Sequence, residues 1–381
     1  MSLFPRFPAL LLALLVGACA PTLPTPSVPT PPPSKTPRLE LIPASFAQLP
    51  GWESERFQGV FQALQRSCAK LSSKPEWAAP CRAAPGGERD PKAYFESWFK
   101  PWQVQDNGVS DGLFTGYYEA ELKASRAQKH ADQVPLLGLP SDLISADLSL
   151  FDSSLKGKRI EGRLEKNRLV PYYSRAEIEG GRNTAAPILA WADAVDAHIL
   201  SIQGSGRLMF EDGLVHRLGF AASNGQSFKG IGKILKERGK IPEGGDASMP
   251  GIERWLRAHP QEGRRLMAEN PRYIFFRKIE GEGPVGSLGV ALTPERSLAV
   301  DPAFITLGTP VFLSTRLAGG QNFQRLMMAQ DTGSAIKGVI RGDIFFGTGA
   351  QAYEKAGRQK ESGRYWLLLP RDVVPDNALR Q

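Results

Sequence analysis

Histidine and cysteine, which supply most metal ligands and many nucleophiles, are scarce in this chain. There are 4 histidines and 3 cysteines among 381 residues. No two histidines are four residues apart, and neither His-Glu-x-x-His nor a zinc-type cysteine pair occurs. Gly-x-Ser-x-Gly elbows and Walker-type phosphate loops are also missing. We therefore expect no metal site and no cofactor, and the familiar serine-esterase and nucleotide-hydrolase motifs are excluded.

Long apolar runs are missing too. The run from Phe7 to Gly17 follows a basic residue and is too short to span a bilayer, as in a signal peptide. It ends in Val16-Gly-Ala-Cys19, which resembles a bacterial lipobox and predicts removal of residues 1–18 and lipidation of Cys19. Ala20 rather than Asp follows, so the usual sorting rule predicts an outer membrane lipoprotein facing the periplasm. An ordinary signal peptide cut nearby is the alternative.

Proline is concentrated in the next segment. Almost half of the residues from Pro21 to Pro37 are proline. Such a segment cannot bury a core and favours extended polyproline II. At about 3.1 Å per residue it would reach roughly 50 Å. We therefore assign residues 19–38 to a lipidated cysteine and a proline-rich linker that lets the tethered domain reach something nearby.

A block of lysine and arginine typical of nucleic-acid-binding proteins is absent. The formal net charge is +8, but the basic residues are spread along the chain. A positive field attracts anionic polymers in general. A soluble protein with a modest charge excess would have the same composition, and we expect no nucleic-acid partner.

The two cysteines beyond the N-terminal segment are Cys68 and Cys81. An exported protein folds in an oxidising compartment, so we expect them to form a disulfide. A loop this short would stabilise the fold by about 3 kcal/mol in the chain-entropy model. Cys68 also fits a helical series of apolar residues, so it would pack in a core with or without the bond.

Apolar spacing predicts helices in the first and middle parts of the chain. The predicted helices cover residues 52–71, 91–99, 190–197, 231–238 and 249–270. The middle of the chain otherwise gives mixed signals, with short strands expected at 199–208 and 216–220.

From Gly283 onward the pattern is almost entirely that of β-strands. Short apolar runs alternate with turn residues at 292, 298–300, 304–305, 310–313, 326–329, 344–346 and 365–369, with a helix near 350–356. This spacing predicts a small barrel. The β-rich segment Leu113 to Glu119 is a candidate to join it, which would make the middle of the chain an insertion.

The segment from Ala329 to Gly349 is the strongest candidate for chemistry. It places Asp331 and Asp343 among glycines, with apolar residues on both sides. Carboxylates are rarely buried without a partner or a function. Ile344 and two phenylalanines follow Asp343 and could raise its pKa, keeping it protonated near neutrality as a general acid requires.

Several interpretations of this pair remain open. Both aspartates could cap turns. Asp331-Thr-Gly-Ser matches half of an aspartic-protease dyad, but such a dyad needs two motifs and only one is present. A glycosidase is favoured, because cleaving a glycosidic bond needs an acid for the leaving oxygen. Four aromatic residues in the same motifs could stack on sugars or pack in the core: Tyr117, Tyr118, Phe345 and Phe346.

Seven motifs, taken in order, give the chain a family resemblance. They are Phe114–Glu119, Ile202–Arg207, Asn224–Gly225, Asn270–Phe276, Arg296–Pro302, Leu307–Val311 and Asp331–Gly349. They extend over nearly everything after the linker. By them the chain resembles the membrane-bound lytic murein transglycosylase A family.

The resemblance implies a mainly β fold, in which a second, largely β domain is inserted into a double-psi β-barrel domain and a substrate groove lies between the two. Residues 39–121 would form the first part of the barrel domain with N-terminal helices. Residues 122–282 would form the inserted domain. Residues 283–381 would complete the barrel domain and carry the catalytic acid.

The resemblance also implies a reaction. It is cleavage of the MurNAc-GlcNAc β-1,4 bond of peptidoglycan without water, which leaves 1,6-anhydro-MurNAc ends. Asp343 lies where the family has its single catalytic acid, and Asp331 where it has the accompanying aspartate. The groove would be lined by Thr115, Gly116, Tyr117, Gln203, Gly204 and Ser205. Phe220 and Phe228 stand where we expect tyrosines, so two hydroxyls that could bond sugar are missing.

We expect Asp343 to donate its proton to the glycosidic oxygen and then to accept the proton of the MurNAc 6-hydroxyl as that group closes on C1. One rival is a hydrolase that uses Asp331 and Asp343 with water. Another is a non-catalytic lipoprotein that binds peptidoglycan. The implied partners are peptidoglycan glycan strands, the outer membrane through the lipid anchor, and proteins of cell-wall synthesis or division.

Overall fold

The computed structural model describes residues 36–182, 184–242, 244–373 and 375. The signal peptide, the lipidation site Cys19 and the linker as far as residue 35 lie outside the described residues. Within the described ranges, no helix is both long enough and apolar enough to cross a membrane.

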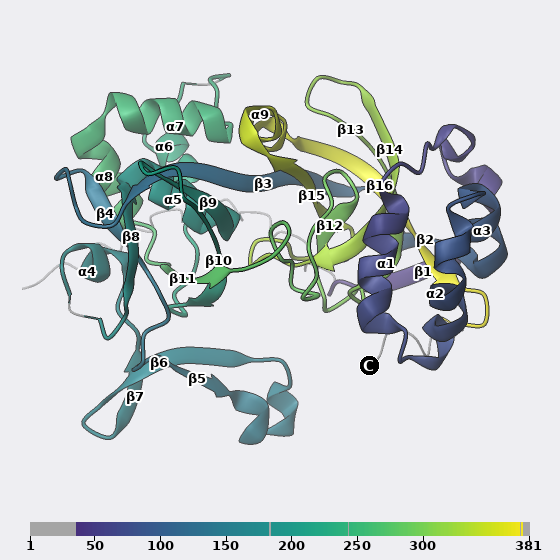
Figure 1. Ribbon diagram of the computed structural model, residues 1–381, viewed down its shortest axis with the longest axis horizontal. Coiled ribbons are helices and arrows are strands. Elements are labelled where there is room, and N and C mark those ends of the chain that lie inside the picture. The colour runs from purple at the N-terminus through teal and green to yellow at the C-terminus, as the bar shows by residue number, and fades with distance from the viewer. Residues whose placement is uncertain (1–35, 183, 243, 374, 376–381) are drawn as a thin grey trace, which may run out of the picture. The chain divides into compact units, whose positions relative to one another are not determined.

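Six strands form a closed barrel at the centre of the structure (Figure 1). They are β3 (Gly112–Ser125), β12 (Ser297–Val300), β13 (Pro310–Arg316), β14 (Asn322–Asp331), β15 (Arg341–Thr348) and β16 (Lys360–Pro370). Their order is β16-β13-β14-β12-β15-β3, and pairing of β16 with β3 closes the ring. The β12–β14 and β15–β3 pairs are parallel. The small barrel and the recruitment of Leu113–Glu119 into it are thus confirmed, whereas residue 292 and residues 304–305 lie outside strands.

Both faces of several barrel strands are buried, which explains their unbroken apolar sequences. Alternate residues of β13 illustrate this: Val311 and Leu313 belong to one core cluster, and Phe312 belongs to another. The first cluster fills the barrel and continues beyond it to residues of the middle segment such as Leu200 and Leu256. The second lies between the barrel and the N-terminal helices, because side chains alternate across a strand.

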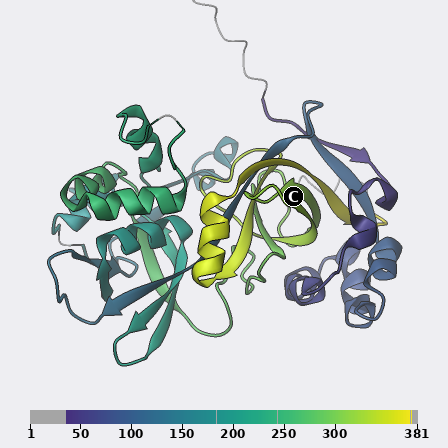
Figure 2. The same ribbon diagram turned by 90° about the horizontal axis from the view of Figure 1, so that it is seen from above.

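The N-terminal layer consists of helices α1 (Val60–Leu71), α2 (Pro75–Gly87) and α3 (Pro91–Trp98), with strands β1 (Leu39–Pro43) and β2 (Phe99–Asp106) and the short turns η1 (Phe46–Gln48) and η2 (Trp52–Ser54). The helix predicted over 52–71 begins only at Val60. Phe57 and Gly59 have φ values of 53° and 75°, which an α-helix cannot accommodate. Both Figures 1 and 2 place α1–α3 on one side of the barrel and the second sheet on the other.

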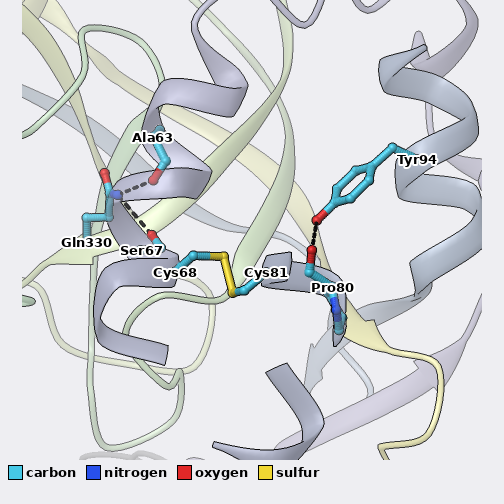
Figure 3. The surroundings of a disulfide bond; sticks show 7 residues. All are labelled: Ala63, Ser67, Cys68, Pro80, Cys81, Tyr94 and Gln330. Atoms are coloured by element: carbon cyan, nitrogen blue, oxygen red, sulfur yellow. Dashed lines mark hydrogen bonds between the residues drawn. A yellow bond between two sulfur atoms is a disulfide. The ribbon is translucent and has the colours of Figure 1, made fainter. Parts of the chain in front are cut away.

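A disulfide joins two helices of this layer, and hydrogen bonds hold the layer on the barrel (Figure 3). Cys68 of α1 is joined to Cys81 of α2 by a disulfide. The buried amide of Gln330 in β14 donates to the carbonyl oxygen of Ala63 at 2.7 Å and to the hydroxyl of Ser67 at 2.9 Å. Two residues of α1 are therefore hydrogen-bonded directly to the strand that ends at Asp331.

The last residues of β3 leave the barrel and enter a second sheet. It has the order β4-β8-β3-β9-β10-β11, with β4 (Gln133–Leu137), β8 (Ile188–Asp193), β9 (Ser205–Phe210), β10 (Val215–Ser223) and β11 (Ile274–Ile279). Helices α4 (Arg175–Glu179), α5 (Ala194–Gln203), α6 (Ile231–Glu237), α7 (Met249–Ala258) and α8 (Pro260–Ala268) accompany it. Helix α9 (Gly349–Arg358) packs on β3 and β15.

A separate small sheet has the order β5-β6-β7, with β5 (Ile144–Asp147), β6 (Arg159–Glu165) and β7 (Arg168–Pro171). Two short 3₁₀ turns, η3 (Leu148–Leu150) and η4 (Ser153–Leu155), connect β5 to β6. Sequence periodicity did not identify these strands.

Three predicted elements of the middle segment were misplaced. The helix expected at 190–197 is a strand up to Asp193, whose carboxylate caps α5 by accepting from the backbone of Val195 and Asp196. The strand expected at 199–208 is therefore helical until Gln203. The helix expected at 249–270 is interrupted at His259, because Pro260 begins a new helix.

Candidate active site

A cavity of about 560 Å³ opens between the barrel and the second sheet. Its barrel side is lined by Thr115, Tyr117, Ala299, Asp331, Arg341 and Asp343. Its other side is lined by Gln203, Gly204, Ser205, Phe220, Phe228, Arg272 and Arg277, among others. A volume of this size suits a small ligand or a few sugar rings.

Strand register brings the two aspartates to this cavity. Ala299 of β12 pairs with Asp331 on one side and with Asp343 on the other. Asp343 pairs in turn with Thr115 of β3. Since neighbouring strands are about 4.8 Å apart, the Cα atoms of the two aspartates are separated by roughly 10 Å. The alanine between them has a small side chain, which leaves the space between the carboxylates open to the cavity.

A β-bulge sets this register. Consecutive residues of β12, Leu298 and Ala299, pair with Ala329 and Asp331, so Gln330 is the extra residue in β14. In a regular parallel pair, Gln330 would lie opposite Ala299. The bulge therefore places Asp331 opposite Ala299 and leaves Gln330 to bond to α1.

Among the described residues, one hydrogen-bond donor reaches the carboxylate of Asp343. The hydroxyl of Thr115 donates to Oδ1 of Asp343 at 2.5 Å, and Nη2 of Arg341 donates to that hydroxyl oxygen at 2.7 Å. The pKa of Asp343 is raised from 3.8 to about 6. Burial is the main cause and the negative charge of Asp331 adds to it, while the Thr115 bond and the positive charge of Arg341 oppose the shift.

Asp331 is surrounded by donors. Its Oδ1 accepts from the backbone and hydroxyl groups of Ser287 at 2.9 and 3.0 Å and from the backbone N–H of Thr332 at 2.9 Å. Its Oδ2 accepts from the hydroxyl of Tyr117 at 2.9 Å. Burial raises the pKa of Asp331, and these four bonds oppose the shift because they favour the ionised form.

The two carboxylates are therefore chemically different. Four donors favour the ionised form of Asp331 and one favours that of Asp343, so Asp343 is the better suited of the two to carry a proton. At pH 7 a pKa of about 6 leaves about a tenth of the free molecules protonated, a smaller fraction than the sequence led us to expect. Pairs of acids whose environments separate their pKa values are typical of catalytic sites.

Most of the predicted groove residues do line the cavity. Thr115 and Tyr117 do so together because they are two residues apart on β3. Gln203 ends α5, and its side chain accepts from the backbone of Tyr118 at 3.1 Å. Gly204 has a φ of 79°, which allows the helix to end and Ser205 to begin β9.

Gly116, also predicted to line the groove, is not among the residues that line the cavity. It lies on the opposite face of β3, where a Cβ atom would be 2.5 Å from the ring of Phe346 and 2.9 Å from Cα of Ala356 in α9. The absence of a side chain at this position allows α9 to pack closely against the barrel.

The aromatic residues proposed to stack on sugars are mostly core residues. Phe345 and Phe346 are buried, and Tyr117 uses its hydroxyl to bond Asp331. The aromatic surface of the cavity comes instead from Phe220 and Phe228, which are 50% and 43% exposed.

Sequence reasoning missed two residues that contact the aspartates or their partners. Arg341 precedes Asp343 by two positions on one strand, and this spacing on a single strand face was a usable signal. Ser287 reaches Asp331 from a loop 44 residues away in sequence, and no local pattern indicates such a contact.

Comparison with known proteins agrees with this geometry. Two family models match the chain: "MltA specific insert domain" over residues 113–277 and "3D domain" over residues 296–369. The chain is 33% identical over 278 residues to membrane-bound lytic murein transglycosylase A of Escherichia coli strain K12, covering 70% of this chain and 68% of the relative.

Solved structures are similar as well. A crystal structure of MltA from Neisseria gonorrhoeae has 36% sequence identity and a TM-score of 0.78, covering 90% of this chain and 97% of the other. The crystal structure of E. coli MltA with bound chitohexaose has 26% identity and a TM-score of 0.67, covering 87% of this chain and 91% of the other.

Proposed function

The chain belongs to the membrane-bound lytic murein transglycosylase A family, and from this premise we propose that Asp343 alone supplies the acid and then the base for its reaction. As a member of this family the chain is a lytic transglycosylase, an enzyme that cleaves peptidoglycan. The observation that carries the mechanism is the difference between two aspartates in one cavity: one is held by four donors, the other by a single hydroxyl.

The proton needed for cleavage is held on Oδ2 of Asp343. Arg341 occupies a lone pair of the Thr115 hydroxyl, which therefore directs its own hydrogen to Oδ1 of Asp343. No hydrogen bond from the described residues reaches Oδ2. That oxygen can thus carry the acidic proton and deliver it to the glycosidic oxygen as the bond to C1 breaks.

The same carboxylate then serves as the base. Having lost its proton, Asp343 accepts the hydrogen of the MurNAc 6-hydroxyl, which attacks C1 and closes the 1,6-anhydro ring. This nucleophile belongs to the substrate and is already close, so neither water nor a second catalytic carboxylate is required. A glycan that fills the cavity excludes water and raises the pKa of Asp343 beyond its value in the free enzyme.

Asp331 acts through charge. It lies across Ala299 from Asp343, and its negative charge favours the protonated form of its neighbour. When positive charge develops at C1 in the oxocarbenium-like transition state, the same negative charge stabilises it.

The second sheet completes the groove. We assign Gln203, Gly204 and Ser205 to backbone and side-chain contacts with the glycan, and Phe220 and Phe228 to stacking on sugar faces. This assignment is supported by their position in the cavity and by the exposure of the two phenylalanines. A related enzyme with bound chitohexaose supports a site for several sugars.

The finer features of the fold follow from family membership. We propose that the closed barrel is a double-psi β-barrel and that residues 122–282 are inserted into a domain formed by 39–121 and 283–381. The two parallel pairs within the barrel and the two separate family-model matches support this assignment.

We place the enzyme at the outer membrane, facing the periplasm, with its lipid on Cys19 and the proline-rich linker spanning toward the cell wall. The membrane-bound designation of its relatives supports membrane attachment. Peptidoglycan strands are the substrate, and proteins of cell-wall synthesis or division are the expected protein partners.

Product analysis tests this proposal. The chain from Thr36 onward is incubated with purified sacculi, and the released muropeptides are weighed by mass spectrometry. We expect ends lighter by one water than reducing ends. We expect Asp343→Asn to abolish these ends, although the variant still folds and unfolds in a cooperative melting transition. Reducing ends would instead assign Asp331 and Asp343 to a hydrolase pair. Binding to sacculi without any release would indicate a non-catalytic lipoprotein.

A further inference from the structure

The small sheet β5-β6-β7 and its connecting turns expose an unusual amount of apolar surface. The most exposed large apolar side chains of the described residues are Leu150, Phe151 and Leu164, at 83%, 81% and 66%. Ile160 and Leu169 add 45% and 39%. Soluble proteins seldom leave such side chains clustered in water unless the surface binds something.

The apolar side chains of the sheet share one face. Ile160 and Leu164 are four residues apart on β6 and so point to the same side. Leu164 lies opposite Leu169 of β7, and Ile160 lies opposite Ala146 of β5. Small and apolar residues from all three strands therefore form a continuous surface.

The other face of this sheet packs on the protein. The guanidinium of Arg163 lies 4.3 Å from the ring centroid of Tyr173. A Cβ atom on Gly225 would be 2.9 Å from Cβ of Glu161, so this face of β6 is in close contact with the body. The apolar face must therefore point outward. In Figure 1 the small sheet projects from the second sheet.

Basic residues border the apolar face. Lys156, Lys158, Lys166 and Arg168 are exposed, and none of them forms an ion pair within the part of the chain that the structure describes. By contrast, Arg159 and Arg163 are near Asp147 and Glu165 at 3.8 and 3.4 Å. Asp152 and Glu161 also have no ion pair among the described residues, so the four unpaired basic groups exceed the unpaired acids of this region by two.

We propose that this apolar face, together with the exposed Leu150 and Phe151 of the connecting turns and the basic border, binds the surface of a phospholipid membrane with anionic headgroups. Apolar side chains that enter the headgroup boundary, together with basic residues that attract anionic lipids, are the combination used by proteins that lie on membranes. The positive border complements the anionic headgroups, and an anchor on Cys19 would hold the sheet near the bilayer at high effective concentration. The contact itself depends on neither the anchor nor catalysis.

Vesicle flotation tests the inference. The chain from Pro37 onward forms a compact unit, so a protein starting at Thr36 can be tested without its lipid. We expect it to float with vesicles of phosphatidylethanolamine and phosphatidylglycerol, and much less with phosphatidylcholine alone. Leu150→Ser/Phe151→Ser should weaken binding at least about tenfold. Lys156→Gln/Lys158→Gln should weaken it about fivefold per charge and reduce its salt dependence.

A double variant of exposed apolar residues elsewhere, Val109→Ser/Leu139→Ser, is the matched control and should bind as the wild type does. These two side chains are 56% and 54% exposed. Wild-type protein that fails to float with anionic vesicles would overturn the proposal, as would equal binding by the Leu150/Phe151 variant. Melting transitions and activity on sacculi should be unchanged in all variants. If the wild-type protein binds vesicles but releases no anhydromuropeptides from sacculi, the catalytic proposal is refuted and the membrane proposal stands.

Discussion

The descending limb of the pH–rate profile should be set by the pKa of Asp343. If the protonated acid is required, kcat/KM is flat below the pKa of this group and falls above it. Burial raises that pKa to about 6, so the rate should fall about tenfold per pH unit above that value. The protonated fraction is about nine tenths at pH 5 and about a tenth at pH 7.

Two substitutions should move this limb in opposite directions. Asp331→Asn removes a negative charge that favours protonation of Asp343, so the pKa falls and the limb moves to lower pH. Thr115→Val removes the hydroxyl that stabilises ionised Asp343, so the pKa rises and the limb moves to higher pH. Both variants can lower the maximal rate as well, but the position of the limb does not depend on its height.

The assay is the initial rate of anhydromuropeptide release from sacculi, measured between about pH 4 and pH 9. Thr332→Val is the matched control for Thr115→Val. The substitution keeps the backbone N–H that donates to Asp331. The hydroxyl that it removes contacts Ser287 and not Asp343, so the limb should stay in place. Shifts of the same sign in the Asp331 and Thr115 variants, or no shift in either, would refute the assignment of the limb to Asp343.

Three stability predictions follow from the same contacts. Because the folded pKa of Asp343 is raised from 3.8 to about 6, its contribution to stability is complete below pH 3.8 and is lost as pH rises through about 6. Asp343→Asn should therefore stabilise the fold at pH 7 by about 1–3 kcal/mol in urea unfolding, and the gain should vanish near pH 4. Glu55→Ala leaves the buried guanidinium of Arg296 without its carboxylate 3.0 Å away and should cost about 3–5 kcal/mol; a loss under about 1 kcal/mol would contradict this. Replacing Cys68 and Cys81 by serine should lower the free energy of unfolding by about 3 kcal/mol, with kcat unchanged in the folded fraction.

The barrel could be predicted because its strands are short apolar runs separated by turn residues. Helix boundaries were harder, since they depend on single residues whose backbone geometry sequence does not reveal. Positive φ at Phe57 delays α1 to Val60, and the Asp193 cap delays α5. Helix α2 was missed because Pro80 and Pro85, which usually end helices, lie inside it.

The sequence likewise identified some residues of the candidate site and not others. Asp331 and Asp343 were found because carboxylates among apolar residues are chemically unusual. Gly116 was predicted to line the groove because the family motif was taken as a whole, although strand alternation places residue 116 on the other face of β3 from Thr115 and Tyr117. Phe220 and Phe228 could not be distinguished from core phenylalanines by sequence, since only the tertiary fold leaves them exposed.

One irregular residue connects these observations. The bulge at Gln330 turns its amide toward α1, where it bonds Ala63 and Ser67, and leaves Asp331 opposite Ala299. The backbone carbonyl of Gln330 accepts from the N–H of Leu288 at 3.0 Å. This bond holds the loop from which Ser287 donates to Asp331. A regular strand would put the amide of Gln330, which bears no charge, beside Asp343. The bulge therefore determines where the negative charge lies, and with it the pKa of the acid. We therefore expect α1, which lies far from Asp331 and Asp343 in sequence, to support the proposed catalysis by holding Gln330 in place.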